Sequence, residues 1–174
     1  MTCRTRTTAS SSARAIENLI SSYAFLNDDA DVRGLGELFA DGVFTLDGRT
    51  AQGREEIQAI AGTVIEKNPD GTSRTSHTIS NLIIEVDEEA GTAEARSYWT
   101  LLQSVPGLPL APIRHGRYHD RFECRDGAWR FVSRTATTTW AQGLMTTAQT
   151  GTAVIDAEDP STTHPSSRWD PHGV

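Results

Sequence analysis

The sequence predicts a single α+β domain, in which helices from the first half of the domain cover one face of a curved antiparallel sheet formed by the second half. Two observations carry this prediction. In the first half, apolar residues recur at three- and four-residue spacing, which is typical of helices that bury one face. From residue 75 to residue 140, apolar and polar residues alternate, which is typical of strands. A chain of 174 residues is long enough to form one such domain with a core.

Three helices are expected in the first half. The first runs from Ala13 to about Asn27, and Asp28 follows at its exit. The second is shorter, and Gly34 and Gly36 lower its helix propensity. The third begins after Gly53 and ends before the helix-breaking segment 68–71. The residues expected on the buried faces are Ile16, Leu19, Ile20, Tyr23, Leu26, Val32, Leu35, Leu38, Phe39, Ile57, Ile60 and Val64.

A small hairpin and four long strands complete the predicted domain. The hairpin consists of Val43 to Leu46 and a short return through Thr50, with its turn at Asp47-Gly48. Alternation then predicts which strand residues face the helices. The long strands are expected at Thr75–Val86, Ala93–Gln103, Ile113–Glu123 and Trp129–Trp140. The residues expected to face inward are Trp99, Leu101 and Gln103, and then Gly116, Tyr118, Asp120 and Phe122.

The net charge and the lengths of the apolar runs limit the partners that the chain is expected to bind. The formal net charge is −7 and Lys67 is the one lysine, whereas nucleic-acid binding depends on clustered Lys and Arg. No apolar run approaches the roughly 20 residues that span a bilayer. We expect a cytoplasmic protein with no nucleic-acid or membrane partner.

The chain is expected to divide into three parts. Residues 1–12 are expected to form a disordered N-terminal tail, residues 13–145 the domain, and residues 146–174 a polar C-terminal tail.

Neither a metal nor a nucleotide cofactor is expected. His115 and His119 would lie about 13 Å apart on a strand, at roughly 3.3 Å per residue, so they do not share an ion. The chain has no glycine-rich phosphate loop and no serine-hydrolase elbow. Cys3 and Cys124 are too few for a thiolate metal site, and no disulfide framework is expected from them.

Two ionisable residues occupy positions that suit acid–base chemistry. Asp28 lies at the exit of the first helix, where the helix dipole slightly disfavours an anion. His77 begins a long strand and has no charged neighbours in the sequence. Taken singly, each is compatible with a structural role: a turn carboxylate for Asp28, and a histidine satisfied by a backbone carbonyl for His77.

Several short segments occur in an order and spacing that is more specific than any one of them alone. They are Tyr23–Asp31, Leu35, Leu38–Asp41, Gly53–Ile57, Thr75–Asn81, Gly116–Phe122 and Asp126–Phe131. Together they resemble the SnoaL-like branch of the nuclear-transport-factor-two-like superfamily, over nearly all of the segment from Ala13 to Trp140. The resemblance implies a cone, in which a curved antiparallel sheet wraps around the N-terminal helices and encloses a pocket. It also implies a homodimer formed through the exposed face of the sheet.

Within that superfamily, the chain looks most similar to scytalone dehydratase and hexachlorocyclohexane dehydrochlorinase. Both use an Asp at the end of the first helix and a His on the first long strand, and Asp28 and His77 match these positions. Gln103 stands where scytalone dehydratase has a second histidine, and Tyr118 stands where it has a pocket asparagine. These two differences leave the acid–base arrangement of that enzyme in doubt for this chain.

The residues and the resemblance together predict a cofactor-independent lyase or isomerase that acts on a hydrophobic, oxygenated small molecule such as a polyketide, terpenoid or steroid. His77 is expected to take the proton and Asp28 to orient it. The expected substrate-binding residues are polar (Tyr23, Gln103 and Tyr118) or apolar (Phe44, Trp99 and Trp140). Two alternatives stay open: a SnoaL-like cyclase that closes a ring or opens an epoxide, and a non-catalytic ligand-binding or assembly module.

Overall fold

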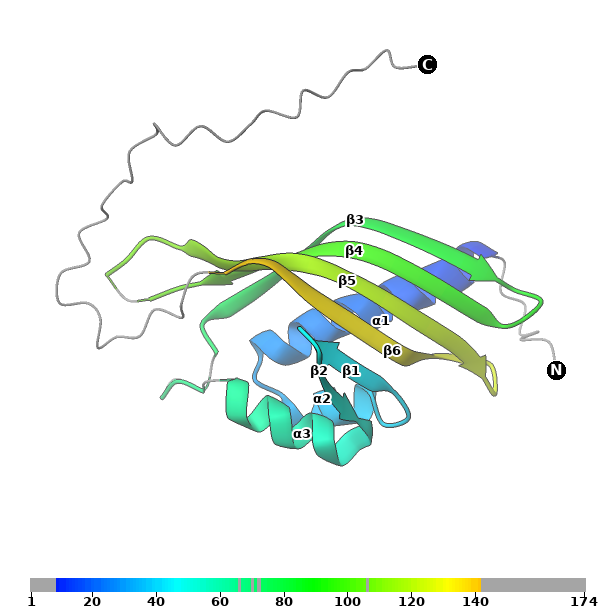
Figure 1. The fold of residues 1–174 in the computed structure, drawn as a ribbon, viewed down its shortest axis with the longest axis horizontal. Coiled ribbons are helices and arrows are strands. Elements are labelled where there is room, and N and C mark those ends of the chain that lie inside the picture. Colours follow the sequence, from blue (N-terminus) through cyan, green and yellow to red (C-terminus); the bar gives the residue numbers. More distant parts are fainter. Residues whose placement is uncertain (1–8, 66, 70, 72, 106, 142–174) are drawn as a thin grey trace, which may run out of the picture.

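The residues that the structure describes form three helices and one six-stranded sheet (Figure 1). The structure is a computed structural model and describes residues 9–65, 67–69, 71, 73–105 and 107–141. The helices are α1 (Ala9–Asp28), α2 (Val32–Leu38) and α3 (Gly53–Val64). The strands are β1 (Val43–Leu46), β2 (Arg49–Gln52), β3 (Thr75–Asp87), β4 (Thr92–Gln103), β5 (Ala111–Arg125) and β6 (Ala128–Ala141).

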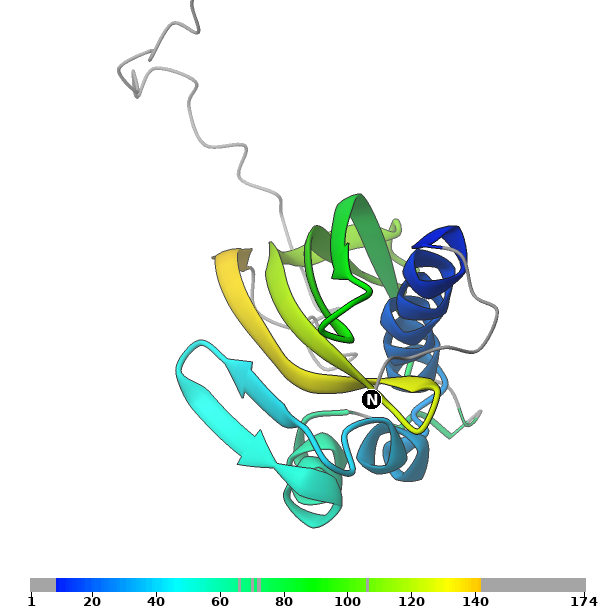
Figure 2. The same ribbon diagram turned by 90° about the vertical axis from the view of Figure 1, so that its right-hand side faces the viewer.

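The order of the strands in the sheet is β2-β1-β6-β5-β4-β3. The four long strands form the antiparallel meander that alternation predicted. The β1–β2 hairpin joins this meander by a parallel pairing of β1 with β6, so the small hairpin extends the same sheet. Figure 2 shows the long strands curving around α1, which lies along one face of the sheet. The predicted α+β class and curved sheet are confirmed.

The helices differ from their predicted form in two respects. α1 begins at Ala9, inside the segment 1–12 that was expected to be a tail; residues 1–8 and 142–174 lie outside the described residues. Ile60 and Val64 are 40% and 62% exposed, so their predicted burial was wrong. The reason is the position of α3, which packs on α2 and β2 at the end of the sheet and buries Ile57 and Ala61 instead.

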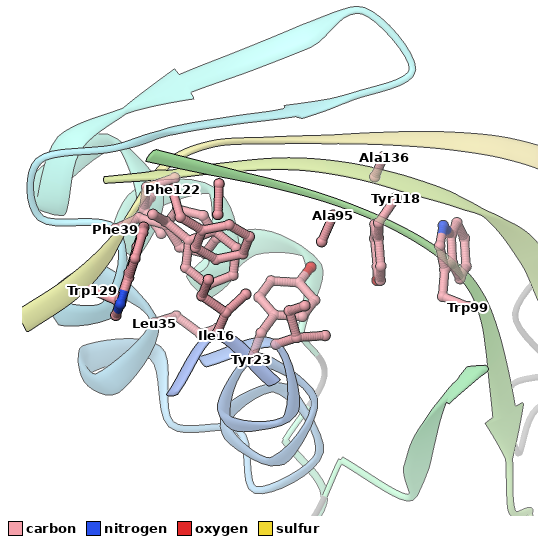
Figure 3. Packing of buried hydrophobic residues seen from close by; sticks show 14 of the residues in the cluster. Ile16, Tyr23, Leu35, Phe39, Ala95, Trp99, Tyr118, Phe122, Trp129 and Ala136 are labelled. Atoms are coloured by element: carbon pink, nitrogen blue, oxygen red, sulfur yellow. The ribbon is translucent and has the colours of Figure 1, made fainter. Parts of the chain in front are cut away.

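The core lies between α1 and the inner face of the sheet. Ile16 and Ile20 of α1 are 0% and 1% exposed. Beside them, Phe131 packs against Phe39 and Phe122, with ring centroids 4.7 and 4.6 Å away. Figure 3 shows Phe39, Phe122 and Trp129 at one end of the core and Tyr118 and Trp99 at the other, with Tyr23 between them. The two tyrosine hydroxyl groups therefore lie in the half of the core away from the phenylalanines.

Cys124, near the end of β5, departs from its predicted state. It is disulfide-bonded, so the expectation of no disulfide framework was wrong for this residue.

Gly116 of β5 leaves the space that the ring of Trp99 occupies. A Cβ atom at Gly116 would lie 2.1 Å from the carbonyl oxygen of Thr137 and 2.7 Å from the ring of Trp99. Neither the sheet backbone nor a ring that is 3% exposed can move away cheaply. The glycine in the Gly116–Phe122 segment is therefore required by the packing of Trp99.

We expect Gly116→Ala to destabilise the fold by about 1–3 kcal/mol, as overpacking of a dense core does. Gly62→Ala is the matched control, because a Cβ at this position of α3 would meet nothing within 4 Å. The control should raise stability by up to about 1 kcal/mol, since alanine is the better helix former. Urea unfolding followed by circular dichroism measures the free energy of unfolding of both variants. Equal changes in Gly116→Ala and Gly62→Ala would contradict the packing argument.

Asp47 fastens the β1–β2 hairpin to β6. Its carboxylate accepts hydrogen bonds from the backbone N–H and the hydroxyl of Thr138, both at 2.7 Å. These two bonds hold the pKa of Asp47 below its usual value. A carboxyl group whose pKa is lowered by folding adds stability above its unfolded-state pKa, and this stability is lost as the pH falls through the folded-state pKa.

Asp47→Asn should therefore lower the free energy of unfolding by about 1 kcal/mol at neutral pH, a value that exposure of the pair keeps small. The difference from the wild-type protein should shrink as the pH falls below about 3.9. Asp126→Asn, in the exposed turn between β5 and β6, is the control. Urea unfolding at several pH values gives the measurement, and a difference that stays constant with pH would contradict the role of the Asp47 carboxylate.

Candidate active site

The carboxylate of Asp28 holds the start of β3 against the end of α1. Its Oδ2 accepts a hydrogen bond from the backbone N–H of His77 at 2.8 Å, and its Oδ1 lies 2.7 Å from His77 Nδ1. The hydroxyl of Thr75 also donates to Oδ1, at 3.3 Å. The two residues that the sequence singled out are therefore in direct contact, although they lie 49 positions apart.

Ser73 supports this junction from the chain just before β3. Its hydroxyl donates to the backbone carbonyl of Asp28 at 2.6 Å and lies 2.7 Å from the hydroxyl of Thr75. Carbonyl groups at the end of a helix lack partners within the helix, so Ser73 satisfies one of them. Ser73 and Thr75 were not predicted as site residues from the sequence. The signal was a pair of hydroxyl residues shortly before the candidate histidine.

The contact with Asp28 favours one tautomer of a neutral His77. In that tautomer, the Nδ1 that faces a carboxylate oxygen carries the hydrogen and donates it, which would leave Nε2 as a proton acceptor. The side chains of His77 and Asp28 are 12% and 21% exposed, so the pair is largely shielded from water but not sealed. A neutral imidazole oriented in this way is suited to act as a general base.

Aromatic rings extend from this pair into the core. Tyr23 of α1 lies edge-on to His77, with ring centroids 6.2 Å apart, and contacts Phe44 at 5.8 Å. Tyr118 of β5 lies 5.8 Å from Tyr23, and Trp99 of β4 stacks on Tyr118 at 5.6 Å. The structure therefore brings Tyr23, Phe44, Trp99 and Tyr118 into one connected group of rings that begins at His77.

Gln103 and Trp140, also expected in the site, occupy different environments. Gln103 is 7% exposed, as its predicted inward orientation requires, and pairs with Thr75 in the β3–β4 ladder. Trp140 is 44% exposed at the end of β6 and stands opposite His115. It lies outside the buried cluster that contains the other aromatic residues named for the site, and its role as an apolar wall stays a prediction.

A buried ion pair lies next to these rings and was missed by the sequence analysis. Arg134 of β6 donates to Asp120 of β5 through Nε at 2.8 Å and Nη2 at 2.7 Å, and both side chains are 0% exposed. Burial acts to lower the pKa of Arg134, but Asp120 outweighs it and the pKa is raised. The guanidinium therefore stays charged inside the core.

The register of β6 explains why Arg134 was missed. Strict alternation from the buried Phe131 would direct Ser133 inward and Arg134 outward. The β5–β6 pairing shifts between Arg121 and Phe122, where the ladder is irregular. This shift directs Arg134 inward beside Asp120. An inward Asp120 without a predicted partner was the one signal in the sequence.

Burial also changes the acidity of the two tyrosines. It raises the pKa of Tyr23 and raises the pKa of Tyr118 well above its usual value, while the charge of Arg134 acts in the opposite direction on both. Both hydroxyl groups therefore stay protonated and are able to donate hydrogen bonds.

Within the part of the chain that the structure describes, no three His, Cys, Asp or Glu side chains are grouped so as to hold a metal ion. None of the described helices has the length and apolar character needed to cross a membrane.

The segment that contains this site, residues 8–135, matches the model of the SnoaL-like domain. The chain belongs to the SnoaL-like family. The match extends from before α1 into β6 and includes Asp28, His77, Tyr118 and Arg134. Among curated proteins, none matches the chain in sequence.

Several solved structures are similar to this SnoaL-like protein. A candidate scytalone dehydratase from Novosphingobium aromaticivorans is 25% identical, with a TM-score of 0.61 over 78% of this chain and 89% of that chain. An NTF2-like protein with a cystatin-like fold from the same organism is 25% identical, with a TM-score of 0.61 over 75% and 84% of the two chains. LinA, a hexachlorocyclohexane dehydrochlorinase, is 24% identical, with a TM-score of 0.62 over 76% and 89%. The likeness to LinA shows a shared fold.

Breaking the buried ion pair of Asp120 and Arg134 should lower the free energy of unfolding far more than breaking an exposed ion pair does. Asp120→Asn leaves Arg134 buried without its counter-ion and is expected to lower stability by about 3–5 kcal/mol. Glu85→Gln is the control: it breaks the exposed contact with Arg96 at 3.5 Å and should cost less than about 1 kcal/mol.

The double variant Asp120→Leu/Arg134→Met tests whether the loss comes from an unpaired charge. It should regain most of the stability, because two apolar side chains replace the whole pair. Urea unfolding of the three variants gives the comparison. A mild effect of Asp120→Asn, similar to that of Glu85→Gln, would show that the pair is not buried in solution.

Proposed function

We propose that this SnoaL-like protein is a cofactor-independent lyase or isomerase that removes a proton from a hydrophobic, oxygenated small molecule. The observation that carries the proposal is the 2.7 Å contact between His77 Nδ1 and Asp28 Oδ1. A core histidine with a purely structural role needs one partner of any kind, and a backbone carbonyl is enough for it. Here a carboxylate that also binds the histidine's own backbone N–H fixes both the ring and its tautomer.

In the proposed reaction, His77 Nε2 takes a proton from a carbon of the substrate. The electron pair of the C–H bond forms a new double bond, and a group on the neighbouring carbon leaves with its bonding pair. If that group is a hydroxyl, it receives the proton from His77 and leaves as water. Asp28 stabilises the imidazolium that forms between the two steps.

The polar rings beside the dyad suit a substrate that gains negative charge on an oxygen. Tyr118 and Tyr23 are protonated donors in a buried setting, where a hydrogen bond to a developing charge is strengthened by the low dielectric. Gln103 adds an amide at the same end of the sheet as Thr75. Phe44 and Trp99 would contact the apolar part of the substrate.

The dyad also bears on the two alternatives. The hydrogen-bonded contact favours catalysis over a ligand-binding or assembly module, which has no need for an oriented base. A SnoaL-like cyclase would use the same pair to remove the proton before it closes a ring. Assembly into a homodimer through the outer face of the sheet stays a prediction of the family resemblance.

His77→Ala and Asp28→Asn are each expected to reduce turnover by about 10²–10⁴-fold, the contribution of a positioned acid–base group. His119→Ala is the control, because His119 is exposed on the outer face of the sheet and contacts Glu94. Turnover is measured by mass spectrometry on a panel of hydroxylated and halogenated ring ketones, and circular dichroism checks the fold. Near-normal turnover in either dyad variant would refute the proposed base.

A further inference from the structure

The guanidinium of Arg134 has one donor that Asp120 does not use. Nε and Nη2 bind the two carboxylate oxygens, whereas Nη1 is buried and has no hydrogen-bond partner among the described residues. Buried donors are nearly always paired, because an unpaired one loses its hydration without compensation. The ion pair is therefore incomplete on the side that faces away from Asp120.

Two tyrosine rings cover this guanidinium. The Cζ atom of Arg134 lies 4.1 Å from the ring centroid of Tyr118 and 4.4 Å from that of Tyr23. Both distances fall within the range of cation–π contacts, so the charge holds the rings in place as well as polarising them. Because Asp120 fixes the guanidinium in two places, the positions of both rings depend on the ion pair.

The rings of the two tyrosines lie edge-on to each other, with ring centroids 5.8 Å apart. Burial raises the pKa of both hydroxyl groups, so each keeps a hydrogen that it can donate to a ligand. Trp99, stacked on Tyr118, has an Nε1 that is buried and likewise without a partner within the described chain.

These groups are donors, and they lie next to the proposed base. Tyr23 is in ring contact with His77 on one side and with Tyr118 and Arg134 on the other. A group of hydrogen-bond donors with a buried positive charge behind it favours an acceptor that gains negative charge. An ammonium group or a purely hydrocarbon part of a substrate would gain nothing from this arrangement.

We propose that Arg134, anchored by Asp120, is a positioning residue that holds the Tyr23–Tyr118 hydroxyl pair as a binding site for an oxyanion. The inference rests on the proposed function and deepens it by naming the substrate class. The substrate is a ketone or a related carbonyl compound, and its carbonyl oxygen receives negative charge as an enolate when His77 takes the neighbouring proton. Tyr23 and Tyr118 contact that oxygen, whereas Arg134 acts through them.

4-Nitrophenol tests the site without any need for turnover, because its phenol and phenolate forms absorb at different wavelengths. The wild-type protein should bind it as the phenolate at a pH where the free compound is mostly neutral. Tyr118→Phe removes one hydroxyl without touching the ion pair, and should lower the ratio of phenolate to phenol in the bound state by about tenfold or more, the effect of one lost hydrogen bond to a charged group.

Arg134→Lys tests the positioning role. Lysine keeps the charge but loses the planar, two-point contact with Asp120, so the same ratio should fall although both tyrosines are present. Tyr98→Phe is the matched control among the three tyrosines of the chain, because Tyr98 lies on the outer face of the sheet, stacked on His115. It should leave the bound spectrum unchanged.

Three outcomes would overturn the inference. They are a wild-type protein that does not bind the probe or binds it as neutral phenol, a phenolate that persists unchanged in Tyr118→Phe or in Arg134→Lys, and a phenolate that disappears in His77→Ala. The last result would make protonated His77, not the tyrosine pair, the partner of the anion. A different result would refute the proposed function. Normal turnover in His77→Ala would show that His77 is not the base, whatever the spectrum of the bound probe shows.

Discussion

The carboxylate of Asp28 makes the contact on which the candidate site depends. It lies at the end of α1, where the helix dipole is unfavourable for an anion, yet it accepts hydrogen bonds from the backbone and the ring of His77 and from the hydroxyl of Thr75. These three donors offset the loss of hydration. One group thereby joins α1 to the edge strand β3 and orients the proposed base, so the fold and the proposed chemistry depend on a single interaction.

The buried pair of Asp120 and Arg134 is the second constraint, and stability alone does not explain it. Replacing such a pair by apolar side chains is often neutral or favourable, because two charges must otherwise be removed from water. Here the guanidinium is enclosed by Tyr118, Tyr23 and Phe131, all within 4.9 Å of its Cζ atom. The charge therefore contacts the rings that connect the core to His77. The proposed role of Arg134 in positioning these rings would account for a charged pair at this place in the core.

The sequence predicted the elements well because their hydrophobic patterns are regular, and it failed where local geometry breaks the pattern. The four long strands are longer than predicted by one or two residues at most of their ends. Arg134 was missed because an irregularity in the β5–β6 ladder reverses the alternation around it. Ser73 was missed because residues before a strand follow no period, and Ile60 and Val64 were misplaced because α3 covers only the end of the sheet. The pairing of Asp28 with His77 came from the family resemblance, since no local pattern relates residues 49 positions apart.

The central claim is that Asp28 fixes His77 with Nε2 as the free proton acceptor. Nitrogen-15 NMR of the imidazole rings tests it directly, because the shifts of the two nitrogens report which one carries the hydrogen. The chain has five histidines, and His77→Ala assigns the relevant signals. At neutral pH the His77 ring should carry its hydrogen on Nδ1 and none on Nε2, and Asp28→Asn should remove this preference. A wild-type His77 with its hydrogen on Nε2, or a tautomer unaffected by Asp28→Asn, would contradict the account.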